Sequence, residues 1–94
     1  MGLVGKWRKI STGQCDQIYP ATIEFFERPR YLGHKGQDQG FIWWDAGNYE
    51  VVSENQVRLS VATDAQTLYH FAISGDILTF IDYESCEFQY CRAT

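Results

Sequence analysis

Apolar and polar side chains alternate along most of this chain, which is the pattern of β-strands with one buried face. The alternation is clearest from Gln56 to Ala62, where Val57, Leu59 and Val61 are separated by polar residues. Similar short segments follow one another from end to end, with Gly, Pro, Asp, Asn or Ser between them. The pattern therefore predicts eight or nine strands, at residues 3–10, 22–27, 30–34, 41–44, 48–53, 56–62, 67–74, 77–83 and 86–92.

The connections between these segments favour a meander of antiparallel neighbours. Most gaps are short, and Gly75-Asp76 is typical of a two-residue hairpin turn. No stretch has a sustained helical period, and at most one helical turn fits between Thr12 and Tyr19. With an even number of strands, the first runs antiparallel to the last, and their pairing removes both sheet edges. We predict an all-β fold, a small up-and-down barrel that is closed or nearly closed, in one domain over residues 1–94.

Aromatic residues are unusually frequent, with six Phe, six Tyr and three Trp in 94 residues. Each of these side chains can bury roughly 150–250 Å². Strands of about six residues are only about 20 Å long, so they enclose a small interior. We therefore expect aromatic side chains to fill the barrel, which leaves its mouth as the place for a ligand.

The net charge of −4 is unevenly distributed along the sequence. Residues 1–35 carry six Lys or Arg against three Asp or Glu, whereas residues 36–94 carry two against nine. An acidic protein repels nucleic acid and anionic membranes. A nucleic-acid-binding barrel of the OB type is therefore a remote alternative, although aromatic residues on strands suit base stacking.

The two ends of the chain carry residues that resemble those of the lipocalin-like, or calycin, superfamily. Gly5-Lys6-Trp7 matches the Gly-x-Trp that the family carries on its first strand, and Arg92 matches the Arg near the end of its last strand. The resemblance implies that Arg92 stacks over Trp7 and closes the barrel. Such a cation–π contact stabilises by about 0.5–2 kcal/mol. Lipocalins are longer, have a C-terminal helix and hold apolar ligands in a roomy interior, so their ligand binding is not carried over.

The three cysteines have neither a C-x-x-C spacing nor a neighbouring His that would make a zinc site. Cys15 follows the first predicted strand and Cys86 begins the last, so both fall toward the same end of the closing seam. They are candidates for a disulfide. Cys91 is expected to point away from the face of Tyr90, and the redox state of all three cysteines is left open by the sequence. We expect no metal and no cofactor.

Two groups of residues are candidates for a ligand site. Trp43 and Trp44 are consecutive on a predicted strand, so one of them faces the core and the other faces solvent or covers a barrel mouth. Arg28 and Arg30, held apart by Pro29, could clamp a carboxylate or phosphate because guanidinium groups bind such anions bidentately. Both groups also have a structural explanation. The tryptophan that faces outward could be covered by a loop, and the two arginines could be solvated loop charges.

These observations predict a non-catalytic binding module for a small apolar or anionic ligand at a barrel mouth, near Trp43, Trp44, Arg28 and Arg30. The alternative is a protein interaction module, including a homodimer, that uses an exposed Trp and a strand edge. No triad, phosphate loop or pair of catalytic carboxylates is recognisable, so we do not expect an enzyme. The chain shows no signal peptide or membrane-spanning segment, which predicts a cytoplasmic protein, or an exported one if a leader was removed.

Overall fold

A computed structural model describes residues 2–11, 13–36, 39–40, 42–61 and 66–93 of the chain. Eight strands and one short 3₁₀ helix make up its regular structure. The elements are β1 Gly5–Lys9, η1 Cys15–Ile18, β2 Thr22–Phe25, β3 Arg30–His34, β4 Ala46–Ser53, β5 Gln56–Ser60, β6 Gln66–Ser74, β7 Ile77–Ile81 and β8 Glu87–Ala93. In the described part of the chain, no helix has the length and hydropathy needed to cross a bilayer.

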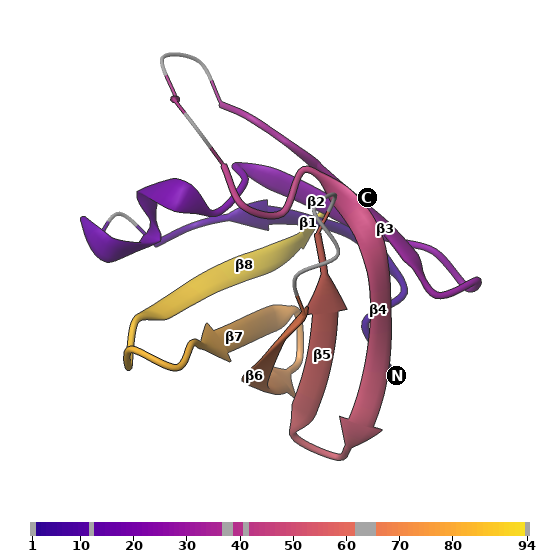
Figure 1. Cartoon of the computed structure of the whole chain (residues 1–94). Coiled ribbons are helices and arrows are strands. Elements are labelled where there is room, and N and C mark those ends of the chain that lie inside the picture. The colour runs from indigo at the N-terminus through magenta and orange to yellow at the C-terminus, as the bar shows by residue number, and fades with distance from the viewer. Residues whose placement is uncertain (1, 12, 37–38, 41, 62–65, 94) are drawn as a thin grey trace.

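The strands form a closed barrel in which each strand pairs antiparallel with its neighbour in sequence. Figure 1 shows the strands curling round in chain order until β8, in yellow, lies beside β1. The predicted all-β, up-and-down barrel is confirmed, and it is closed. Eight strands in a simple meander also differ from the five-stranded Greek-key barrel of OB folds.

The seam between β1 and β8 is where the two ends of the chain meet. Trp7 pairs with Arg92 across it, and the Arg92 guanidinium carbon lies 4.2 Å from the centre of the Trp7 ring. Trp7 is fully buried, and its indole N–H donates to the main-chain oxygen of Leu3 at 2.8 Å. Gly5 has a φ of +134°, and a Cβ there would lie 2.8 Å from the Arg92 side chain. A glycine at this position leaves the room that the guanidinium occupies over the indole.

Aromatic and branched aliphatic side chains fill the barrel, as their number in the sequence predicts. Rings from different segments of the chain are packed edge-to-face or stacked, for example Trp44, which precedes β4, against Phe80 of β7 with centroids 4.9 Å apart. The largest side chains with less than 2% exposure are Trp7, Trp44, Tyr19, Tyr31, Tyr90, Phe25, Phe80, Phe88, Ile23, Leu59, Leu78 and Val57. The inward faces predicted from the alternation of β2, β5, β7 and β8 are the buried ones.

The predicted strand at residues 41–44 is wrong. Residues 42–44 have no strand structure, Phe41 lies outside the described residues, and β4 begins later, at Ala46. Ile42 and Trp44 are buried while Trp43 is exposed, so the alternation is real. The main chain, however, bonds to other segments: the Trp43 N–H donates to the oxygen of Ile18 at 2.7 Å. The single helical turn expected between residues 12 and 19 is η1.

Candidate functional site

The connections after β1, β3 and β7 meet at one end of the barrel, which we call the barrel mouth. A disulfide between Cys15 and Cys86 joins η1 to the turn before β8. The Trp43–Ile18 hydrogen bond joins the segment before β4 to the other end of η1. The three connections therefore hold one another in place, which fixes the geometry of the mouth. Cys91 is the free cysteine of the described chain.

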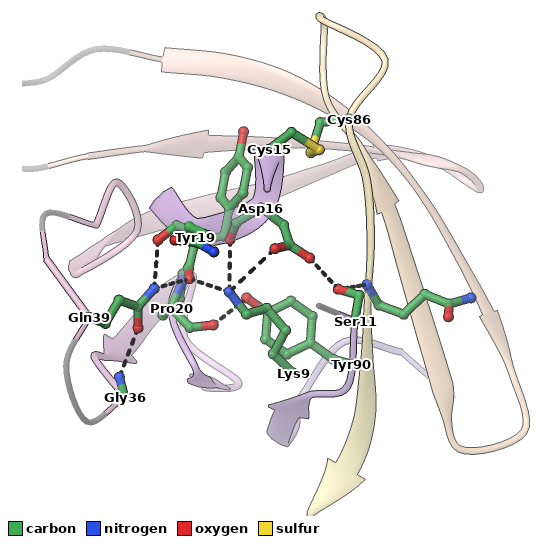
Figure 2. Close-up of polar contacts among 12 residues, drawn as sticks. Lys9, Ser11, Cys15, Asp16, Tyr19, Pro20, Gly36, Gln39, Cys86 and Tyr90 are labelled. Carbon is green, nitrogen blue, oxygen red and sulfur yellow. Dashed lines mark hydrogen bonds and ion pairs between the residues drawn. A yellow bond between two sulfur atoms is a disulfide. The ribbon is translucent and has the colours of Figure 1, made fainter. Parts of the chain in front are cut away.

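A cluster of polar groups anchors η1 to the barrel wall, as Figure 2 shows. The Lys9 ammonium, from β1, donates to the main-chain oxygens of Asp16 at 2.7 Å and Tyr19 at 3.0 Å. Its nitrogen also lies 4.0 Å from the Asp16 carboxylate, which accepts from the Ser11 hydroxyl at 2.5 Å. Burial lowers the pKa of Lys9, and the Asp16 charge partly opposes that shift. The buried charge of Asp16 is thus paired and hydrogen-bonded, as a structural ion pair must be.

The segment before β4 is tied to the same cluster through Gln39. Its amide nitrogen donates to the main-chain oxygens of Gln17 at 2.8 Å and Tyr19 at 2.7 Å, and its amide oxygen accepts from the Gly36 N–H. The Tyr90 hydroxyl donates to the oxygen of Pro20 at 2.7 Å. Figure 2 shows these contacts surrounding the main chain between η1 and Pro20. Because these groups satisfy one another, the cluster is best explained as a structural anchor and not as a site.

A second polar group lies at the inner end of the mouth. The Tyr19 ring stacks on Phe88 with centroids 4.0 Å apart, and its hydroxyl donates to Asp82 Oδ2 at 2.8 Å. Asp82 Oδ1 accepts the N–H groups of Glu84 and Cys86, so the same carboxylate shapes the turn before β8. Burial raises the pKa of Tyr19 well above its usual range, so its hydroxyl stays protonated and remains a donor to Asp82.

Tyr69, on β6, completes this inner wall. Its hydroxyl oxygen accepts from the Trp44 indole N–H at 3.2 Å, and the two rings meet edge-to-face. The Tyr69 ring also meets the Tyr19 ring at 86°, with centroids 6.2 Å apart. Burial raises the pKa of Tyr69 as well. Two neutral phenols and one carboxylate thus face the space at the mouth.

That space is a cavity of about 110 Å³. Ordinary ligand pockets measure about 300–1,000 Å³, so this cavity accommodates a small group and not a whole drug-sized molecule. At its rim, Trp43 is 41% exposed and Tyr83 is 75% exposed. The described residues that line it are Ile18, Tyr19, Trp43, Leu59, Val61, Thr67, Tyr69, Asp82, Tyr83 and Glu84.

The residues predicted as one ligand site fall at opposite ends of the barrel. Trp43 lies on the mouth cavity, while Trp44 is fully buried in the core beneath it. Arg28 is on the connection between β2 and β3 and Arg30 is the first residue of β3; both line an open hollow of about 390 Å³ with Phe26, Glu27 and Leu32. Because β3 runs between the two places, one small ligand cannot contact Trp43 and both arginines.

Tyr19, Tyr69 and Asp82 were not recognised from the sequence as parts of a site. Tyr19 lies in the polar segment between the first two predicted strands. Asp82 is the second-last residue of the strand predicted at 77–83, next to a turn, where an Asp needs no further explanation. The signal that could have singled out Asp82 is its place between the apolar strand at 77–81 and Cys86. Tyr19 and Asp82 are 63 positions apart in the sequence, so no local pattern reveals their contact.

Within the described residues, no group of three His, Cys, Asp or Glu side chains is arranged to hold a metal ion. Comparison with known proteins finds no family model, no curated protein and no solved structure that matches this chain. The site must therefore be interpreted from its own geometry.

Proposed function

We propose that this protein is a non-catalytic, lipocalin-like binding module whose site is the barrel mouth at Trp43 and Tyr83. The observation that carries the proposal is the mouth cavity, which is lined both by the exposed aromatic residues Trp43 and Tyr83 and by the buried Asp82. The rest of the barrel supports it, because side chains fill the interior and leave the mouth as the place for a ligand. The contact of Arg92 with Trp7 supports the lipocalin-like part of the proposal.

A binding role fits the state of the polar groups better than catalysis does. Asp82 accepts hydrogen bonds from Tyr19 and from two main-chain N–H groups of its turn, which occupies its oxygens with structural contacts. The walls of the mouth are held by a disulfide and by the Trp43–Ile18 bond, so a ligand would meet a preformed surface. Preformed sites lose less entropy on binding. An anionic ligand would require the Arg28–Arg30 hollow instead.

The test is an NMR titration of the ¹⁵N-labelled protein with small neutral, anionic and cationic compounds. Trp43 is a convenient reporter because Trp7 and Trp44 are fully buried; a Trp43→Phe variant assigns its indole signal. We expect at least one class of compound to shift the signals of Trp43 and Tyr83. Shifts confined to Arg28 and Arg30, or no shifts with any class, would contradict the proposed site.

A second candidate function, self-association through a strand edge, is favoured by the end of β4. Pairing with β3 covers residues 46–48 of β4, and the strand continues beyond it to Ser53. Val51 is 52% exposed and Val52 is 44% exposed in that extension, next to an open groove of about 580 Å³. An exposed apolar edge can add a strand from a second chain. Sedimentation at increasing concentration tests this, and a monomer at all concentrations would exclude it.

The disulfide supports a location in an oxidising compartment, since thiols are kept reduced in the cytosol. We therefore favour an exported protein over the cytoplasmic one that the sequence suggested. Thiol labelling of the protein in its native cells would test this. We expect only Cys91 to react with the labelling reagent, because Cys15 and Cys86 are joined in the disulfide. Labelling of all three cysteines would contradict this location.

A further inference from the structure

Among the residues that the structure describes, those that line the mouth cavity carry negative charge with no positive charge to balance it. Asp82 is 7% exposed, and Glu84 stands beside it at the rim. None of the described residues that line the cavity is a Lys, Arg or His. The ion pairs of the described chain are Lys9–Asp16 and Arg58–Glu50, so Asp82 has no ionic partner among the described residues.

The hydrogen bonds of Asp82 do not remove this charge. Its donors are a neutral phenol and two main-chain N–H groups, which stabilise a carboxylate but leave it negative. A charge that is withdrawn from water is costly unless an opposite charge compensates it. A cation in the mouth cavity would supply that compensation at short range, in a site with limited access to solvent.

The aromatic side chains around the carboxylate favour the same kind of ligand. Three aromatic residues, Trp43, Tyr83 and Tyr69, line the cavity, and they come from three different segments of the chain. Aromatic faces carry a negative electrostatic potential, which attracts ammonium groups, and quaternary ammonium ligands are bound in this way. A cavity of about 110 Å³ suits such a head group, with the rest of the molecule extending past the rim.

We propose that the barrel mouth binds an alkylated ammonium group, which sits between Trp43 and Tyr83 and is neutralised by Asp82 and Glu84. The inference rests on the proposed function, because it names the ligand chemistry of the same site. The group could be the head of a free small molecule such as choline, or a methylated lysine side chain in a peptide. A bare metal ion is disfavoured, because the described residues offer no set of three ligands.

The experiment is a calorimetric titration with choline and with 3,3-dimethylbutan-1-ol, which has the same shape but no charge. We expect choline to bind at least about tenfold more tightly. Equal affinity would overturn the cationic inference while leaving the proposed binding site intact. Binding of neither compound, nor of any class in the NMR panel, would overturn both. A peptide that carries trimethyllysine, titrated in parallel, distinguishes the two sources: tighter binding of the peptide indicates a protein ligand, and tighter binding of choline a free one.

Matched variants locate the charge that is responsible. Asp82→Asn keeps the oxygen that accepts from the turn and removes the charge, so we expect about a tenfold loss of choline affinity. Glu54→Gln makes the same change of charge in the exposed β4–β5 turn and should leave the affinity unchanged. If Asp82→Asn does not fold, Glu84→Gln and Tyr83→Leu replace exposed side chains and should each weaken choline binding several-fold. Unchanged affinity in both would overturn the inference.

Discussion

Reducing the Cys15–Cys86 disulfide removes the covalent link between the loop after β1 and the turn before β8. The two cysteines are 71 residues apart, so the bond closes a loop that covers most of the chain. In the chain-entropy model, a loop of this length restricts the unfolded state by about 4 kcal/mol at 25 °C. A domain of this size has a free energy of unfolding of about 5–15 kcal/mol, so reduction should remove a large part of it.

The assay is urea unfolding of the oxidised and reduced protein, followed by tryptophan fluorescence. With a denaturant dependence of about 1 kcal/mol per molar urea, the midpoint should fall by about 4 M on reduction. A Cys15→Ala/Cys86→Ala variant should match the reduced protein, and Cys91→Ala should keep the oxidised midpoint. A midpoint that moves by less than about 1 M would refute the reasoning, because it would mean that the bond restricts the unfolded chain very little.

Three further predictions concern the seam, the packing beside β4 and the buried tyrosines. A double-mutant cycle of Trp7→Leu and Arg92→Leu should give a coupling of about 0.5–1 kcal/mol, and no coupling would show that the stacking is not stabilising. Gly33→Ala would place a Cβ 1.9 Å from the Trp44 main-chain oxygen and should cost about 3 kcal/mol in chemical unfolding. In Gly40→Ala the added Cβ would meet open space, so the free energy of unfolding should change by less than about 0.5 kcal/mol. Similar losses of stability in the Gly33 and Gly40 variants would refute the steric explanation. Burial raises the pKa of several tyrosines: above pH 10 the unfolded chain loses protons that the folded protein keeps, so stability should fall as the pH rises. Urea midpoints that stay constant above pH 10 would contradict this expectation for Tyr19, Tyr31, Tyr69 and Tyr90.

The error at residues 41–44 explains why the predicted ligand site was not a single place. In an up-and-down barrel, successive connections lie at alternate ends. Arg28 lies in the connection after β2 and Arg30 begins β3, whereas Trp43 belongs to the connection after β3, so the arginines and Trp43 are at opposite ends. Counting Trp43 and Trp44 as a strand of their own hid this alternation. The local pattern could not reveal the mistake, because Ile42 and Trp44 are buried as strand residues would be.

The resemblance to lipocalin-like proteins implied the closing pair of Trp7 and Arg92. The sequence pattern by itself determined the antiparallel meander and the inward faces of β2, β5, β7 and β8. It could do so because alternation and hairpin connections are local properties, and a meander places neighbours in sequence side by side. Only the tertiary structure decided that Tyr19 meets Asp82, that the mouth is acidic and aromatic, and that the arginines lie elsewhere. These features depend on which segments meet at each end of the barrel. The contacts between these segments follow from closure of the whole sheet, so they cannot be predicted from a local sequence pattern.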